Sequence, residues 1–216
     1  MNFEQARFNM IEQQIRPWDV LDSSVLELLS LVRREDFVPA ALRQLAFVDT
    51  ELPLSGERKA LAPRVEARML QALKVLRHEK VLEIGTGMGY LTALLSHKAQ
   101  HVHSVEADAE LAAHARESLR RSGCVNVTIH QGPAQDGVMA EAPFDAVLLC
   151  GSVAEVPQAL LDQVKVGGRL LAVVGEEPAM QLQLRRRTAT GWTTEVLLET
   201  VVARLPGLQE PATFTF

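Results

Sequence analysis

Residues 80–90 read Lys80-Val-Leu-Glu-Ile-Gly-Thr-Gly-Met-Gly-Tyr90. They begin with a short apolar run that predicts a buried strand over 80–84, and they continue into glycines at alternate positions. The residues that follow, 90–96, are rich in good helix formers. A strand, a glycine turn and a helix in this order form a backbone-lined cradle that suits a nucleotide-like ligand. Glycine is needed there because a Cβ would obstruct both the tight turn and the close approach of a ligand.

The spacing of the glycines distinguishes between two classes of ligand. The dinucleotide pattern G-x-G-x-x-G would need its third glycine at position 90, where this chain has Tyr90. The pattern here is E-x-G-x-G-x-G from Glu83, which resembles the loop of class I methyltransferases that bind S-adenosylmethionine. Glu106 ends the next apolar stretch, where a carboxylate can bind both ribose hydroxyls. The alternative is a glycine turn in an ordinary α/β protein with a solvated Glu106, but the order of strand, loop, helix, strand and acid favours ligand binding.

Length and composition limit the remaining possibilities. A chain of 216 residues with 47% hydrophobic residues can form one large domain with a substantial core. Its net charge of −5 provides no global basic field, so we expect no nucleic acid and no membrane as partner. Cys124 and Cys150 do not have the spacing of a metal-binding or redox motif. No apolar run reaches the roughly 18 residues of a membrane span, and the first residues lack the apolar centre of a signal peptide. We therefore expect a cytoplasmic protein with reduced thiols.

From residue 80 onward, strand and helix patterns alternate, which predicts an α/β fold with a doubly wound, mostly parallel sheet. Near 181–185 and 192–202 the pattern instead predicts an antiparallel hairpin that closes the sheet. Ligands bind such sheets at the carboxyl ends of the strands, where the glycine loop, Glu106 and the loops at 132–134 and 150–152 fall. The expected strands lie near 80–84, 101–106, 126–130, 144–149 and 169–174, and the expected helices near 90–97, 109–121 and 154–162.

The first 62 residues lack this alternation. Apolar residues at helical spacing predict helices over 3–15 and 25–32, while Pro53 and Gly56 mark a loop within the mixed segment 40–62. Pro63 suits the first turn of the helix that follows. We therefore expect a helical lead-in at 1–62 on the substrate side and a ligand-binding domain at 63–216.

Several segments together resemble the protein-L-isoaspartate O-methyltransferase family. The resemblance covers about residues 20–175, and the order of its segments is more specific than the glycine loop alone. It implies the seven-stranded class I methyltransferase fold, S-adenosylmethionine as the methyl donor, and an altered aspartyl carboxylate in a damaged protein or peptide as the acceptor. The segments include Arg33-Arg-Glu-Asp-Phe-Val-Pro39, Ala46-Phe-Val-Asp49, Leu52-Pro-Leu54, Ala62-Pro63, residues 81–93, Ala142-Pro-Phe-Asp-Ala-Val147 and Val166-Gly-Gly-Arg-Leu170.

The resemblance also implies a set of cofactor-binding residues. The glycine loop would hold the methionine part of the cofactor, Glu106 its ribose, and Glu83 the floor of the loop. The loop after the third strand would lie near the adenine. The expected cofactor-binding residues are Glu83, Gly85, Thr86, Gly87, Gly89, Tyr90, Glu106, Pro133 and Ala134.

The chain departs from the family pattern in two loops. The family loop before the proline-headed helix typically reads Ser-Ala-Pro-His or Ser-Gln-Pro-Tyr, and its serine is the residue assigned to catalysis; here the loop reads Leu61-Ala-Pro-Arg64. The family Gly-Asp-Gly is Gly132-Pro133-Ala134 here, so an acid that resembles an adenine-contacting group is missing. Asp136 is a candidate substitute for that acid.

These departures affect alignment more than chemistry. A carboxylate acceptor is already anionic and needs no general base, so much of the rate comes from alignment, which can approach ~7–11 kcal/mol in well-oriented systems. A serine can donate a hydrogen bond that positions the acceptor and Leu61 cannot; such a charge-assisted bond is worth about 1.5–3 kcal/mol, or roughly 10- to 100-fold in rate. Arg64 offers a charged fork that could hold the carboxylate instead. The alternatives are that Arg64 is a surface residue at a helix start and that Leu61 only packs on apolar surface.

Three functions remain open on the sequence. The leading one is an S-adenosylmethionine-dependent O-methyltransferase of the isoaspartyl-repair type, and the second is a divergent relative that binds the cofactor but has a different acceptor or little catalysis. A nicotinamide-dependent oxidoreductase is disfavoured by Tyr90. His101 and His103 alternate on one strand, but without a third ligand nearby we expect no metal site. The oligomeric state and the true acceptor are not determined by the sequence.

Overall fold

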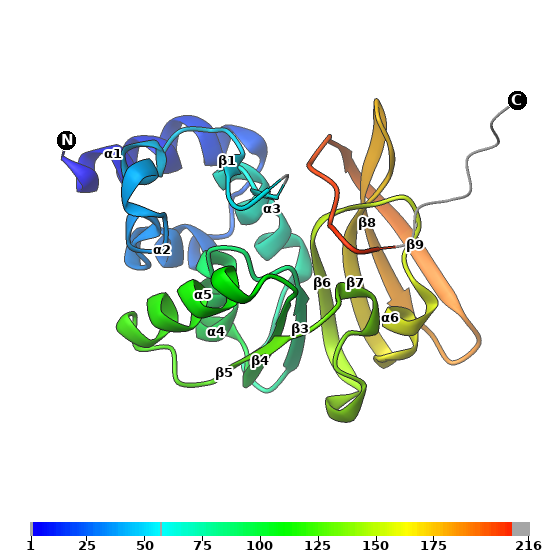
Figure 1. The fold of residues 1–216 in the computed structure, drawn as a ribbon. Coiled ribbons are helices and arrows are strands. Elements are labelled where there is room, and N and C mark those ends of the chain that lie inside the picture. The colour runs from blue at the N-terminus through cyan, green and yellow to red at the C-terminus, as the bar shows by residue number, and fades with distance from the viewer. Residues whose placement is uncertain (1, 57, 209–216) are drawn as a thin grey trace, which may run out of the picture.

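A seven-stranded sheet forms the centre of the computed structural model, which describes residues 2–56 and 58–208 (Figure 1). The strand order is β5-β4-β3-β6-β7-β8-β9. Strands from β5 to β7 run parallel, whereas β8 and β9 are added antiparallel at one edge. The expected doubly wound sheet with an antiparallel end is therefore confirmed. The strands are β3 (Lys80–Ile84), β4 (His101–Glu106), β5 (Val127–Gln131), β6 (Phe144–Val153), β7 (Val164–Glu176), β8 (Ala179–Arg187) and β9 (Trp192–Glu199).

Helices cover both faces of the sheet. Successive side chains of a strand point to opposite sides, so each buried strand contributes apolar residues to the core on both faces. On β7, Leu171 and Val173 belong to the apolar cluster that contains residues of α3, α4 and α5. Their neighbours Leu170 and Ala172 belong to a second cluster with Leu160 of α6. The helices are α3 (Pro63–Leu73), α4 (Tyr90–Lys98), α5 (Ala109–Arg121) and α6 (Gln158–Asp162).

The N-terminal segment is helical, as expected. Helix α1 (Phe3–Met10) continues through a π-helical turn (Ile11–Ile15), and α2 (Ser23–Leu31) follows with Asp22 as its N-cap. Buried residues of this segment share one apolar cluster with α3 and one face of the sheet, so packing is continuous across position 62. The division into two domains at that position stays a prediction. Short 3₁₀ helices lie at Arg16–Trp18, Arg34–Asp36, Ala40–Leu45, Ala134–Asp136 and Met139–Glu141.

A small hairpin stands where the sequence predicted a loop. Strands β1 (Leu52–Pro53) and β2 (Lys59–Ala60) pair antiparallel, and the Leu54 N–H donates to the Arg58 carbonyl at 2.9 Å. Two-residue strands are too short to give a recognisable alternation in sequence, which explains the miss. The hairpin packs its buried Leu52 inward and covers the glycine loop, as described below.

Two other boundaries differ from expectation. Helix α6 begins only at Gln158, because β6 extends to Val153 and Pro157 occupies the N-cap. Strand β7 begins at Val164 rather than near 169, since the Val166-Gly-Gly stretch that resembles a turn is an irregularity within the strand, where the register to β6 shifts.

The segment after β9 returns to the carboxyl edge of the sheet. β9 ends at Glu199 rather than 202, and the chain then runs along the end of β6 (Figure 1). The Ser152 N–H donates to the Ala203 carbonyl, and the Leu205 N–H donates to the Ser152 carbonyl, both at 2.9 Å. The Ala203 N–H also donates to Glu51 Oε1 at 2.8 Å, so residues 203–206 are joined to the segment that leads into the hairpin.

Among the described residues, no helix combines the length and the apolar character needed to cross a membrane.

Candidate functional site

The three glycines of the loop after β3 all have positive φ, at +93°, +54° and +85° for Gly85, Gly87 and Gly89. A Cβ on Gly89 would lie 3.2 Å from the Cβ of Ala115 on α5, and one on Gly85 would lie 2.8 Å from Leu205 Cδ1. The backbone conformation therefore favours glycine at all three positions, and at Gly89 the packing against Ala115 is also tight. The prediction of a tight glycine turn at this point is confirmed.

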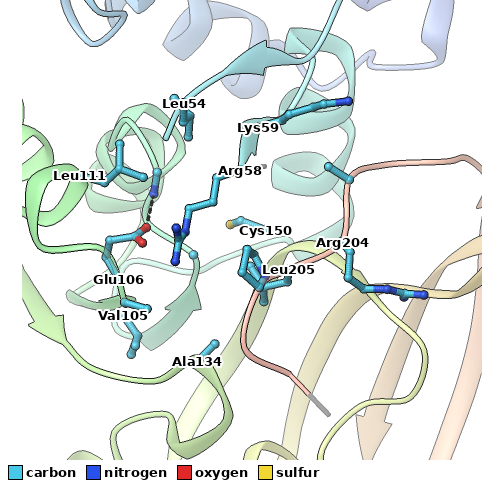
Figure 2. Close-up of a pocket in the computed structure, with 15 residues that line it drawn as sticks. Leu54, Arg58, Lys59, Val105, Glu106, Leu111, Ala134, Cys150, Arg204 and Leu205 are labelled. Atoms are coloured by element: carbon cyan, nitrogen blue, oxygen red, sulfur yellow. Dashed lines mark hydrogen bonds between the residues drawn. The ribbon is translucent and has the colours of Figure 1, made fainter. Parts of the chain in front are cut away.

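The carboxylate of Glu106 lies directly against this loop. Its Oε2 accepts a hydrogen bond from the Gly87 N–H at 2.9 Å (Figure 2). Its Oε1 accepts one from the Asp108 N–H at 3.0 Å. The pairing of β3 with β4 brings the two strand ends together, as the sequence suggested. Because a carboxylate accepts about four hydrogen bonds, Glu106 keeps acceptor capacity for a ligand.

Glu83 supports the loop from below. Its side chain is fully buried, and its Oε2 accepts hydrogen bonds from the hydroxyls of Thr92 at 2.5 Å and Ser104 at 2.6 Å. Burial raises the pKa of Glu83 to about 7, against the opposing effect of these two hydroxyl donors. Because Ser104 gives its only proton to Glu83, the Thr86 hydroxyl must be the donor to Ser104 at 2.6 Å. Thr86 therefore contributes to the loop's framework.

A cavity of about 500 Å³ opens above the loop (Figure 2). Gly85, Gly87 and Glu106 line one side of it, and the hairpin and residues 203–206 line the other. Ala134 contributes to the wall, as expected. Pro133 is not among the lining residues, and Asp136 is exposed. Contact of this loop with an adenine stays a prediction.

A second cavity, of about 330 Å³, adjoins the first. The two share Lys59, Gly85, Gly87 and Cys150 in their linings, and the second is also lined by Leu61, Glu66, Glu83, Thr86 and Tyr90. Leu61, at the position of the family serine, is 4% exposed and lines this second cavity, and its side chain carries no hydroxyl. Whether Leu61 contacts a substrate stays a prediction.

A buried ion pair that the sequence analysis missed holds the Leu61 loop. Arg34 is fully buried; its Nε donates to Glu66 Oε2 at 3.0 Å, and its Nη1 and Nη2 donate to the carbonyls of Ala46 and Leu61 at 2.8 and 3.0 Å. Burial raises the pKa of Glu66, and the Arg34 charge opposes that shift. The arginine stands in the charged run 33–36, where no local pattern indicates burial, so only the tertiary structure reveals its role.

Tyr90 is buried between this ion pair and the loop. Its ring packs edge-on against Phe37 with centroids 5.7 Å apart, and burial raises the pKa of its hydroxyl. Within the described part of the chain, this hydroxyl has no hydrogen-bond partner. Tyr90 lines only the second cavity, which places it behind the loop rather than in the larger opening.

The structure does not bring Arg64 into either cavity. Its Nη1 lies 2.8 Å from Asp49 Oδ2, and its guanidinium stacks on Trp18 at 4.4 Å from the ring centroid. Both partners belong to the N-terminal segment, so the Arg64 side chain is directed toward that segment. Two other arginines, Arg58 and Arg204, line the larger cavity, and neither was singled out from the sequence.

The histidines of β4 have no third metal-ligating partner among the residues described. His103 Nδ1 lies 3.0 Å from Nε2 of His130 on β5, and no group of three His, Cys, Asp or Glu side chains forms there. Burial is the main cause that lowers the pKa of His103, to about 4. The absence of a metal site stays a prediction.

Comparison with known proteins decides the family. Residues 5–203 match the family model described as protein-L-isoaspartate(D-aspartate) O-methyltransferase. The chain belongs to this family. A protein-L-isoaspartate O-methyltransferase of Myxococcus xanthus is 44% identical over 170 residues, covering 79% of this chain and 80% of the relative. One of Syntrophobacter fumaroxidans is 39% identical over 184 residues, covering 85% and 86%.

Solved structures agree with the fold. A Plasmodium falciparum protein assigned to the same methyltransferase family, solved in complex with S-adenosyl-L-homocysteine, superimposes with a TM-score of 0.78. It is 19% identical and covers 96% of this chain and 100% of its own. The match supports the seven-stranded methyltransferase fold and spans both the helical N-terminal segment and the sheet.

Proposed function

We propose that this chain is an S-adenosylmethionine-dependent O-methyltransferase that methylates a carboxylate of altered aspartyl residues in damaged proteins or peptides. The observation that carries the proposal is the meeting of the Glu106 carboxylate and the Gly85–Gly89 loop in one cavity, in a chain of this family. Membership supplies the acceptor class, since the relatives are named for this activity.

The residues of the larger cavity fit S-adenosylmethionine. Gly85 and Gly87 present backbone without Cβ atoms, and Glu106 has remaining acceptor capacity for ribose hydroxyls. Val105, Leu111 and Ala134 add apolar wall that suits a purine. The Plasmodium falciparum neighbour, solved with S-adenosyl-L-homocysteine, supports the same choice. The cofactor supplies a sulfonium-bound methyl group, which a carboxylate oxygen accepts as the carbon–sulfur bond breaks, leaving a thioether and an ester.

The protein's own contribution is positioning. The Thr86–Ser104–Glu83 chain of hydrogen bonds fixes the loop, and the Arg34 fork fixes the backbone at Leu61. Leu54, Arg58 and Lys59 of the β1–β2 hairpin line the cavity on the side opposite the glycine loop. Rigid placement of the two reactants is the main source of rate in such a displacement.

The decisive test measures methyl transfer from labelled S-adenosylmethionine to an isoaspartyl peptide and to its normal aspartyl counterpart. We expect the native protein to methylate only the isoaspartyl peptide. The variant Leu61→Ser restores a hydroxyl, and we expect it to be about 10- to 100-fold faster. Leu61→Ala is the matched control, because it removes the same bulk without adding a donor. Thermal unfolding of all three shows whether the cavity left by the leucine affects stability.

A second candidate, a relative that binds the cofactor without turning over this acceptor, is favoured by one observation. Leu61 stands at the position of the family serine, lines the second cavity and itself carries no hydroxyl. If S-adenosylmethionine binds but neither the native protein nor Leu61→Ser methylates the isoaspartyl peptide, the repair function is wrong. If only Leu61→Ser is active, the fold and cofactor are right and the acceptor has changed.

A further inference from the structure

We propose that Arg58 binds a carboxylate group in the larger cavity, in the role that the sequence assigned to Arg64. The inference rests on the proposed function, because both molecules of that reaction carry such a group: the acceptor at its reacting end and the cofactor on its methionine part. The chemistry is the same in the two cases, a guanidinium fork on a carboxylate.

The position of the side chain carries the proposal. Arg58 stands at the end of the hairpin turn, where its carbonyl accepts from Leu54 and its N–H donates to the Ser55 carbonyl. Its side chain extends from the hairpin into the cavity, and the guanidinium lies between Glu106 and Cys150 (Figure 2). It therefore reaches the space between the expected ribose site and the opening to the second cavity.

The guanidinium has donors to spare. Within residues 2–56 and 58–208, the Arg58 guanidinium forms an ion pair with Asp108 Oδ2. The contact is long, at 3.5 Å, and both side chains are partly exposed. That oxygen already accepts a 2.6 Å hydrogen bond from the Ser55 hydroxyl, while Oδ1 caps α5 through the N–H groups of Glu110 and Leu111. Partly exposed pairs of this kind contribute little, so Arg58 can exchange Asp108 for a ligand at small cost.

The other cations at the cavity are differently engaged. Lys59 lies 3.7 Å from Glu51 and is directed away from the centre of the cavity (Figure 2). Arg204 donates to the Gly175 carbonyl at 3.0 Å and is likewise directed outward. Arg58 is thus the cation of this lining that points at the ligand space.

Charge explains why a carboxylate is the partner. A guanidinium repels the positive sulfonium of the cofactor, so it is accommodated only beside an anionic part of a ligand. An incoming carboxylate would in turn be repelled by Glu106 on the same wall, and Arg58 offsets that repulsion. A lysine at this position would supply charge but not the two parallel donors that match a carboxylate.

The test compares Arg58→Gln and Arg58→Lys with the native protein and with Arg120→Gln, which removes an exposed cation of α5 that is paired to Glu117. Two measurements separate the sources of the carboxylate. The first is kcat and KM for the isoaspartyl peptide at saturating S-adenosylmethionine. The second is calorimetric binding of S-adenosylhomocysteine, which has the carboxylate, and of 5′-methylthioadenosine, which lacks it.

If the acceptor is the partner, Arg58→Gln raises the peptide KM about 10- to 100-fold and leaves both cofactor-analogue affinities unchanged. If the cofactor is the partner, the same variant weakens S-adenosylhomocysteine by a similar factor and does not affect 5′-methylthioadenosine. In both cases Arg58→Lys recovers part of the loss and Arg120→Gln has no effect. Unchanged values in both measurements, or equal weakening of the two nucleosides, would overturn the proposal. A native protein that binds S-adenosylhomocysteine but methylates no isoaspartyl peptide contradicts the proposed function, while the calorimetric comparison still decides the role of Arg58.

Discussion

The substitution Glu106→Gln tests the cofactor site at its most specific residue. The native carboxylate accepts from the N–H groups of Gly87 and Asp108 with its two oxygens, and its remaining lone pairs are available to a ribose. A glutamine amide has one acceptor oxygen, and its NH₂ group would face a donor wherever it is turned. A ribose hydroxyl therefore loses the charged acceptor that the carboxylate offers, and a hydrogen bond to a charged group is worth about 1.5–3 kcal/mol. We therefore expect S-adenosylhomocysteine to bind about 10- to 100-fold more weakly.

Isothermal titration of S-adenosylhomocysteine into the native protein, Glu106→Gln and Glu110→Gln provides the measurement. Glu110 is exposed in the first turn of α5, so its variant controls for the loss of one negative charge near the site. The ligand-free unfolding temperature reports the structural part of the effect, expected at about 1 kcal/mol, or 2–4 °C for a protein of this size. An affinity of Glu106→Gln within twofold of the native value would refute the assignment of Glu106 to the ribose.

Three further outcomes follow from the structure. Gly89→Ala should lower the free energy of unfolding more than Gly123→Ala. Both positions have positive φ, which costs an alanine about 1–2 kcal/mol, but only the Cβ at position 89 would also meet Ala115, at 3.2 Å. Equal losses of stability in urea unfolding would contradict this. His103 has a pKa near 4 in the folded protein against 6.5 ordinarily, so its contribution to stability is complete above pH 6.5 and is lost as the pH falls toward 4; His103→Gln should flatten that dependence. Glu83 acts in the opposite sense, because its raised pKa of about 7 makes the folded state lose stability as the pH rises from 4.5 to 7; a Glu83→Gln profile that keeps the native slope would contradict the burial argument.

The glycine loop illustrates what sequence reasoning does well. The order of strand, alternate glycines, helix and an acid at the end of the next strand depends on local backbone requirements. It predicted that the glycine loop and Glu106 lie together, and the Gly87 N–H donates to the Glu106 carboxylate. Parallel strands with helical crossovers bring their carboxyl ends to one edge, so neighbouring loops could be assigned to one site before any coordinates. Tyr90 and Pro133 do not line the larger cavity, and their assignment to the cofactor stays a prediction.

The cations show where such reasoning fails. Arg58 stands in loop sequence and Arg64 at the start of a helix, both near the expected substrate side, and no local pattern shows which of them faces the ligand space. The fold turns Arg64 toward Asp49 and Trp18, and the β1–β2 hairpin turns Arg58 into the cavity. Arg34 is a stronger case, because no local pattern in the charged run 33–36 indicates that its guanidinium is fully buried.

By itself the sequence determined the α/β sheet, its antiparallel end, the glycine cradle and the acid opposite it. Each of these depends on periodicity, backbone freedom or chain order, which are local properties of the sequence. Only the tertiary structure decided which charged side chains face the ligand space, that Leu61 lies in the second cavity, and that residues 203–206 return to cover Gly85. Those facts depend on contacts between segments far apart in the chain, whose packing no local pattern encodes.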